Sequence, residues 1–240
     1  MQPLAITTTG LSKAFGDLLA VDGIDLAVPR GSFYGFLGPN GAGKSTTIKC
    51  LTGLLQPTAG QIRILDLDPI ADPVAVKRKT GVVPEDLALF DRLTGAETLS
   101  FVGQVHGLDG ASIRKRTTEL LTLMDLVKAS GDLVADYSHG MRKKIALAAA
   151  LLPAPRVLFL DEPFEGIDAV ASRQIKDLLS AFVAGGGTVF LTSHILEIVE
   201  RLCDHIGVIH RGRIVAQGSL ADLRAAGQAG QTLEQLLGNH

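Results

Sequence analysis

The sequence predicts an α/β fold with a largely parallel sheet and a helical subdomain inserted into it. Short apolar runs alternate with segments of helical period along most of the 240 residues. This alternation breaks between about residues 87 and 135, where helix signals continue without a clear strand. Apolar residues make up 46% of the chain and charged residues 20%, which excludes a disordered protein.

The first half of the chain is expected to supply two strands and a helix to this sheet. Ile24–Val28 and Phe33–Leu37 are short apolar runs separated by a Pro-Arg-Gly turn, which is typical of strands. A helix should begin near Lys44, because apolar residues follow it at helical spacing.

The second half is expected to alternate helices and strands and to end in a hairpin, because Pro and Gly residues separate its apolar segments. In order, these are a helix at Ile145–Leu152, a strand at Val157–Leu160, a helix at Ile175–Val183, a strand at Thr188–Thr192, a helix at Ile195–Leu202 and a hairpin of Ile206–Ile209 with Arg213–Ala216.

Composition excludes several classes of protein. The 23 basic and 25 acidic residues give a net charge of −2, so no overall field favours nucleic acid or anionic lipid. The two cysteines, Cys50 and Cys203, form no CxxC motif and predict neither a disulfide framework nor a zinc site. Residues 1–10 lack the features of a secretory signal, and the longest uncharged stretch contains three glycines. A soluble chain in a reducing compartment is expected, with any membrane role provided by a partner.

A phosphate-binding loop is the most specific motif of the sequence. Residues 38–45 fit G-x-x-x-x-G-K-[ST] between a predicted strand and a predicted helix. Its backbone N–H groups and the helix dipole would hold ATP, while Lys44 reaches the β- and γ-phosphates and the Ser45 hydroxyl binds Mg²⁺. The predicted nucleotide-binding residues of this loop are Gly38, Pro39, Asn40, Gly41, Ala42, Gly43, Lys44, Ser45 and Thr46.

Two acidic residues follow the apolar run 157–160. A single carboxylate here would be an ordinary strand end, but Asp161 and Glu162 are adjacent and lie downstream of a phosphate loop. The pair fits coordination of Mg²⁺ by Asp161 and activation of the attacking water by Glu162.

No arginine finger can be assigned within the chain. Ser138-His139-Gly140-Met141 instead opens a predicted helix, where a hydroxyl and exposed N–H groups can bind an anion. Taken alone, this segment is better explained as an ordinary N-cap.

The order of these motifs resembles the nucleotide-binding domain of an ATP-binding cassette (ABC) transporter, over about Leu4–Leu223. Ser138–Met141 lies where that family has its signature motif, usually L-S-G-G-Q, and residues 161–168 are similar to its D-loop. Thr192-Ser193-His194 resembles the switch histidine at a strand end, and Phe15 resembles the aromatic residue that stacks on adenine.

The resemblance implies a P-loop NTPase core with an antiparallel β subdomain and a helical subdomain at about 87–135. The ATP-binding domain would span residues 1–223, and residues 224–240 would form a loosely held tail. Two such domains would associate head to tail, so that Ser138, His139, Gly140, Met141 and Asp168 meet ATP held by the partner's phosphate loop. His194 would contact the γ-phosphate and hold Glu162 and the water in line.

The chain departs from the usual family pattern at two motifs. Glu85 replaces a glutamine that would face Mg²⁺, so it would keep an oxygen ligand and add a charge. Tyr137, His139 and Met141 replace residues of the signature motif. Both departures resemble the motifs of second-type exporters, a subgroup in which the permease is a separate chain.

The first functional hypothesis is therefore an ATP-hydrolysing subunit of an exporter. It would work as a homodimer or with a second ATP-binding subunit, bound through the permease at the cytoplasmic face of the membrane, without nucleic acid. One alternative is a soluble ABC-type ATPase of repair, cluster assembly or translation. It is weakened by the single phosphate loop and by the absence of a long insertion between Ser45 and Ser138. A nucleotide-gated scaffold without turnover is a third hypothesis, because of Glu85 and His139. The basic triplets 77–79, 114–116 and 142–144 are expected on solvated faces.

Overall fold

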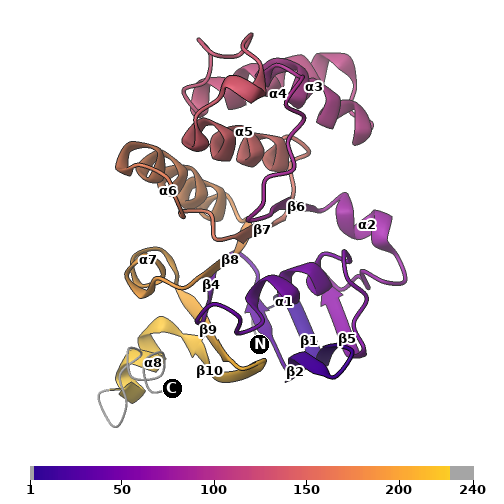
Figure 1. Ribbon diagram of the computed structural model, residues 1–240, viewed down its shortest axis with the longest axis vertical. Helices are drawn as coiled ribbons and strands as arrows, with labels where there is room; N and C mark the ends of the chain where they lie inside the picture. The colour runs from indigo at the N-terminus through magenta and orange to yellow at the C-terminus, as the bar shows by residue number, and fades with distance from the viewer. Residues whose placement is uncertain (1–2, 228–240) are drawn as a thin grey trace.

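The computed structural model describes residues 3–227, which fold around two sheets (Figure 1). The larger sheet has the strand order β10-β9-β4-β8-β7-β6. Its strands are β4 (Phe33–Leu37), β6 (Thr80–Val83), β7 (Val157–Asp161), β8 (Thr188–Ser193), β9 (His205–His210) and β10 (Arg213–Ser219). Every neighbouring pair is parallel except the β9–β10 hairpin, so the predicted largely parallel sheet is confirmed.

The central strands of this sheet are covered on both faces. All residues of β4, β7 and β8 are buried, as expected for near-continuous apolar runs in a parallel sheet. Because parallel strands place their carboxyl ends at one edge, the residues that follow β4, β7 and β8 lie close together. The phosphate loop, Asp161-Glu162 and His194 are the segments at these ends.

The smaller sheet is antiparallel and packs beside the core. It consists of β1 (Leu4–Phe15), β2 (Leu18–Ile24), β3 (Ala27–Pro29) and β5 (Ala59–Ile64), with β1 pairing with the other three strands. The predicted strand Ile24–Val28 is wrong, because β2 ends at Ile24 and β3 begins at Ala27. The chain turns between them, where the Leu26 N–H donates a hydrogen bond to the Thr8 hydroxyl at 2.8 Å.

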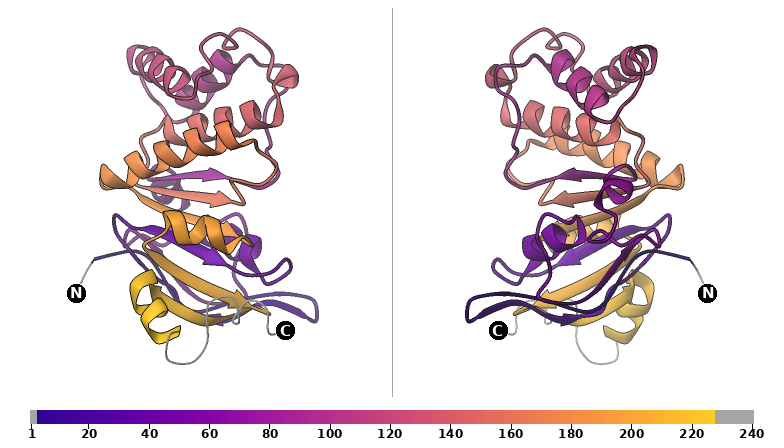
Figure 2. Two further views of the ribbon diagram at one scale, coloured as in Figure 1. Left: turned by 90° about the vertical axis from the view of Figure 1, so that its left-hand side faces the viewer. Right: turned by 90° about the vertical axis from the view of Figure 1, so that its right-hand side faces the viewer.

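The helices lie around the core and at one end of the molecule. They are α1 (Lys44–Leu51), α2 (Pro73–Lys77), α3 (Gly95–Val105), α4 (Gly110–Leu123), α5 (His139–Leu151), α6 (Ala169–Ala184), α7 (Leu196–Leu202) and α8 (Leu220–Gly227), with a short 3₁₀ helix, η1 (Val134–Asp136). Figures 1 and 2 place α3 and α4 at the end opposite the antiparallel sheet, with α5 between them and the core. Within residues 3–227, no helix is long and apolar enough to cross a bilayer.

The segment predicted as a helical subdomain contains α3, α4 and η1. Thr94 and Glu97 form a capping box that starts α3, in which each side chain accepts a hydrogen bond from the other residue's N–H. The close packing of α3 on α4 requires Gly103, since a Cβ atom there would lie 2.6 Å from the Ile113 side chain. The proposed domain boundary at 223/224 stays a prediction. Helix α8 runs through it, and residues 228–240 of the predicted tail lie outside the described residues.

Candidate functional site

The phosphate loop joins β4 to α1 at the carboxyl edge of the large sheet. Gly43 caps α1 with φ 109°, a conformation that L-residues rarely adopt, and a Cβ atom there would lie 2.5 Å from the Ala20 carbonyl oxygen. No side chain caps the first turn of this helix, so its N–H groups face the loop. The loop is therefore built as an anion-binding helix start.

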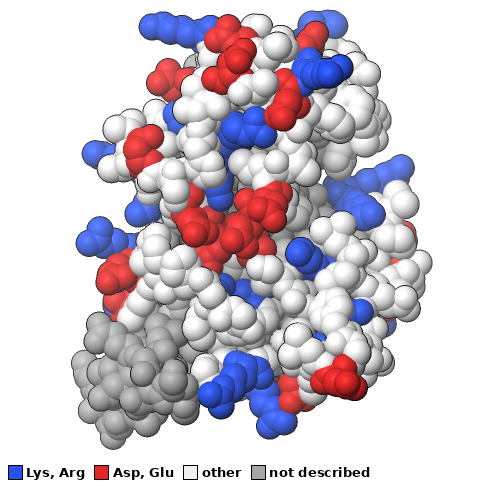
Figure 3. Space-filling view, viewed as in Figure 1, with Lys and Arg blue, Asp and Glu red and all other residues white. Residues whose placement is uncertain are grey.

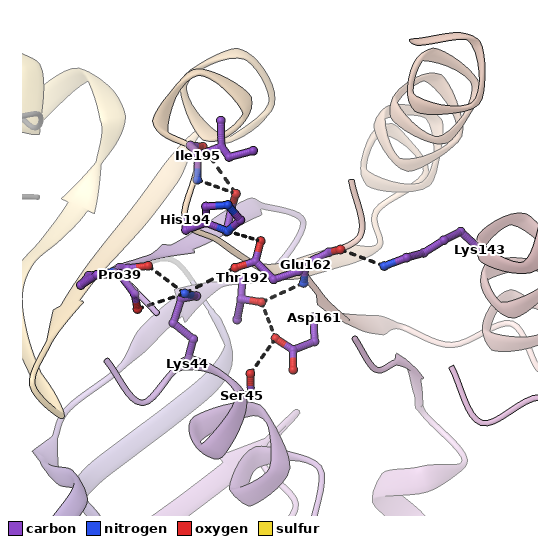
Figure 4. Close-up of polar contacts among 11 residues, drawn as sticks. Pro39, Lys44, Ser45, Lys143, Asp161, Glu162, Thr192, His194 and Ile195 are labelled. Atoms are coloured by element: carbon purple, nitrogen blue, oxygen red, sulfur yellow. Dashed lines mark hydrogen bonds and ion pairs between the residues drawn. The ribbon is translucent and has the colours of Figure 1, made fainter. Parts of the chain in front are cut away.

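Lys44 points back across this loop toward the end of β7 (Figure 4). It is only 6% exposed, and its ammonium group donates hydrogen bonds to the carbonyl oxygens of Gly38 at 2.7 Å and Pro39 at 3.2 Å. Its Nζ also lies 3.4 Å from Glu162 Oε1, so the motif cation and the predicted base form a buried ion pair.

Thr192, for which no role was predicted, connects the two acidic residues. The Thr192 hydroxyl donates to Asp161 Oδ1 at 2.6 Å and accepts from the Glu162 N–H at 3.0 Å. The Ser45 hydroxyl donates to the same Asp161 oxygen at 3.3 Å. This network fixes Asp161 opposite the start of α1 and ties Glu162 to strand β8.

Glu162 is 7% exposed and has the left-handed backbone value φ 47°. Its Oε2 lies 3.2 Å from His194 Nδ1, and its carbonyl oxygen accepts a hydrogen bond from Lys143 Nζ at 3.0 Å. Among residues 3–227, no group donates a hydrogen bond to the buried Glu162 Oε1. A carboxylate that is paired with Lys44 and His194, and in which one oxygen accepts no hydrogen bond from the described residues, is suited to receive a proton from water.

The donor set fits Mg²⁺. The Ser45 hydroxyl and the Asp161 carboxylate supply oxygen atoms, which this ion prefers. In the part of the chain that the structure describes, no three His, Cys, Asp or Glu side chains gather into a metal cage. Mg²⁺ commonly binds through one or two protein groups, with substrate phosphates and waters completing its shell, and this pair matches that mode.

A pocket of about 410 Å³ brings together Phe15 and most of the residues predicted for the phosphate loop. It is lined by Phe15, Leu18, Ala20, Asn40, Gly41, Gly43, Lys44, Ser45, Thr46, Glu85, Glu162 and Glu165. Gly38, Pro39 and Ala42 belong to the loop behind it, and Asp161 and His194 adjoin it through Ser45 and Glu162. Glu165 was missed as a lining residue, because a loop position after the two acids gives no local signal of its direction.

Phe15 and Glu85 lie in this pocket as expected from the resemblance. The Phe15 ring is 47% exposed, and Lys13 Nζ lies 5.0 Å from its centroid. Burial raises the pKa of the Glu85 carboxyl, and the charges of Asp161, Glu165 and Glu162 raise it further. Figure 3 shows acidic side chains concentrated in the middle of this face.

The segment resembling the signature motif lies outside this pocket. Ser138 caps α5, with its hydroxyl accepting from the Met141 N–H at 3.3 Å. Ser138 and His139 are exposed, and His139 Nε2 lies 3.4 Å from the Glu165 carbonyl oxygen. Asp168 caps α6, and the Ala171 and Val170 N–H groups lower the pKa of its carboxyl. The structure thus gathers Ser138, His139, Gly140 and Asp168 on a neighbouring surface, whereas Met141 is half-buried and packs against the core.

One expectation about charge is wrong. The triplet 142–144 was assigned to a solvated face, but Lys143 and Lys144 are buried. Short sequence runs cannot reveal this, because the burial results from α5 packing between the core and α3 rather than from its own periodicity.

Comparisons with known proteins agree with this geometry. The family model described as "ABC transporter" matches residues 21–165. The chain is 41% identical over 225 residues to the daunorubicin resistance ATP-binding protein DrrA3 of Streptomyces coeruleorubidus, covering 94% of this chain and 71% of that protein. It is 38% identical over 226 residues to the linearmycin resistance ATP-binding protein LnrL of Bacillus subtilis (strain 168), covering 94% and 72%. A solved structure of an ATP-binding subunit of an ABC transporter superposes with a TM-score of 0.89 at 32% identity, covering 98% of both chains.

Proposed function

Because this chain belongs to the ABC transporter family as an ATP-binding subunit, we propose that it hydrolyses ATP to drive an exporter whose permease is a separate chain. The observation that carries the proposal is the convergence of Lys44, Asp161 and His194 on Glu162 and the phosphate loop. The drug-resistance names of the two relatives favour an exporter over a soluble ATPase of repair or translation.

The residues of the pocket divide the chemistry among them. The loop N–H groups and Lys44 bind the phosphates, and Phe15 stacks on the adenine. Ser45 and Asp161 hold Mg²⁺ with Glu85 nearby, and the ion supplies positive charge for the phosphate oxygens. Glu162 accepts the proton of the attacking water. His194, whose Nδ1 lies 3.2 Å from Glu162 Oε2, orients the Glu162 carboxylate.

The site needs a second copy or a paired subunit to be complete. Ser138, His139 and Gly140 lie beside Asp168 and Glu165 rather than in the pocket of their own chain. Head-to-tail pairing would place this exposed start of α5 on the partner's nucleotide, where its N–H groups supply the charge that an arginine finger supplies elsewhere.

The permease would dock at a cleft between the core and the helical subdomain. The cleft measures about 390 Å³, and Pro84, Leu87, Phe90 and Val102 are among its lining residues. Phe90 is 56% exposed and packs edge-on against Phe101, with ring centroids 5.2 Å apart. The segment 84–87 lines this cleft on one side and, through Glu85, the nucleotide pocket on the other, which suits force transmission. Docking would hold the chain at the cytoplasmic face.

One experiment tests the ATPase and the dimer together. The Glu162→Gln variant keeps the shape of the side chain but removes the base, so hydrolysis should fall about 100-fold or more while ATP binding persists. Size-exclusion chromatography with ATP and Mg²⁺ should then show a dimer of this variant and a monomer without ATP. A monomer under conditions where ATP is bound contradicts the head-to-tail arrangement, and unchanged hydrolysis contradicts the role of Glu162.

A further inference from the structure

Lys143 is a buried cation that the proposed chemistry does not use. It lies on α5 and is 3% exposed, and its ammonium group donates to the backbone carbonyl oxygen of Glu162 at 3.0 Å (Figure 4). Burying an ammonium group is costly unless it is paired, so a position like this one requires compensation. The compensation comes from carboxylates that lie near the end of β7.

Four carboxylates, those of Glu165, Glu85, Asp161 and Glu162, favour the charged form of this lysine. Burial lowers the pKa of Lys143, and these charges act against that effect. The hydrogen bond itself nevertheless goes to a main-chain oxygen. A contact with the backbone fixes the direction of a peptide unit, which an ion pair with a flexible carboxylate would not do.

The backbone of Glu162 needs such support. A residue with a Cβ atom at φ 47° is strained, and such a conformation persists only where surrounding contacts hold it. The Glu162 N–H is held by Thr192 of strand β8, and its carbonyl is held by Lys143 of α5. The backbone of Glu162 is thus held by one hydrogen bond from the core and one from α5.

We infer that Lys143 is a positioning residue for Glu162, which makes the orientation of the base depend on the placement of α5. The inference rests on the proposed function, in which Glu162 is the base and the start of α5 meets the partner's nucleotide. Lys143 is five residues after Ser138, the N-cap of the same helix, which is about 7.5 Å along the helix axis. Because a helix moves as a unit, contact of the partner with the first turn of α5 changes the hydrogen bond from Lys143 to the Glu162 carbonyl oxygen. Each half of the dimer would therefore sense occupation of the other site.

The first test compares two neighbouring variants of α5. Lys143→Met keeps the length and apolar stem of the side chain but removes the donor, so kcat should fall about 10- to 100-fold. The dissociation constant for ATP should stay within about threefold, since Lys143 does not line the nucleotide pocket. Arg142→Met is the matched control, because Arg142 contacts Asp91 and the Val134 carbonyl inside the helical subdomain and leaves Glu162 untouched. Its kcat should stay within about threefold of the parent.

The second test separates positioning of the base from general support of the helix. In a Glu162→Gln background, Lys143→Met should lower single-turnover hydrolysis by less than about threefold, because residues that act through one group are not additive. ATP-dependent dimerisation of the double variant should persist. A full additional loss of hydrolysis, or loss of the dimer, overturns the inference, since either shows that Lys143 supports α5 itself.

The remaining outcomes are also decisive. Lys143→Arg retains a charged donor and should recover at least part of the lost kcat, whereas Lys143→Gln is one atom too short and should resemble Met. If the Met variant does not fold, the Gln variant replaces it in both tests. Parent-like kcat of a folded Met or Gln variant overturns the inference alone, whereas a parent protein without ATPase activity overturns the proposed function.

Discussion

The buried hydroxyl of Thr192 offers a direct measurement of how the site is held together. Thr192→Val keeps the branched shape of a residue that is 0% exposed but removes the group that connects Asp161 to the Glu162 N–H. Loss of a hydrogen bond to a charged acceptor costs about 1.5–3 kcal/mol, and an unsatisfied buried N–H costs about 1–3 kcal/mol. We therefore expect the free energy of unfolding to fall by about 2.5–6 kcal/mol.

Thr188→Val is the matched control at the other end of the same strand. Thr188 is also buried, but its hydroxyl accepts one hydrogen bond, from the Gly31 N–H at 2.9 Å, and none from a charged group. This change should lower the free energy of unfolding by about 1 kcal/mol. Urea denaturation without nucleotide measures both losses, and ATPase assays should show kcat lowered at least about tenfold by Thr192→Val only. Equal destabilisation by the two variants would refute the connecting role of Thr192.

Three further changes test separate parts of the site. Lys44→Ala should weaken ATP binding at least about tenfold in calorimetry, because it removes a charge-assisted contact, and an unchanged dissociation constant would rule out the phosphate-loop assignment. Glu85→Gln should keep turnover within about tenfold, because an oxygen ligand remains. It should also raise the urea midpoint at pH 8 but not at acid pH. The raised pKa of Glu85 means that its ionised form is disfavoured in the folded state, a cost that is absent once the carboxyl is protonated. Gly140→Asp should leave ATP binding to the isolated chain intact and abolish ATP-driven dimerisation, because it sets a carboxylate against the partner's phosphates. Dimerisation of that variant at parent levels would show that α5 does not face the nucleotide.

Local patterns were enough to predict the parts of the fold that form from neighbouring residues. The phosphate loop, the start of α1 at Lys44 and the strand before Asp161 each depend on residues adjacent in sequence. The spacing of residues in the sequence was therefore enough to predict the local geometry of these segments. The helical subdomain was predicted for the same reason, since its helices have their own caps and apolar faces.

Long-range pairing produced the features that the sequence did not reveal. Strand β1 contains Thr7, Thr8 and Thr9. Strand β2 follows it through a short turn, but β3 and β5 pair with it from further along the chain. Thr192 and Lys143 reach Glu162 across sequence separations of 30 and 19 residues. Each is an ordinary residue of its own element, and only the arrangement of β7, β8 and α5 gives it a place at the site.

In the proposed head-to-tail dimer, the starts of α1 and α5 would meet different nucleotides. The start of α1 opens into the pocket with Lys44 and Ser45, whereas the start of α5 lies beside the cap of α6 at Asp168. The pocket that contains the start of α1 is lined by no residue of 138–141. Exposed N–H groups at a helix start favour an anion from outside the chain. In the proposed dimer this anion would be the nucleotide of a second subunit, so pairing would complete both sites at once.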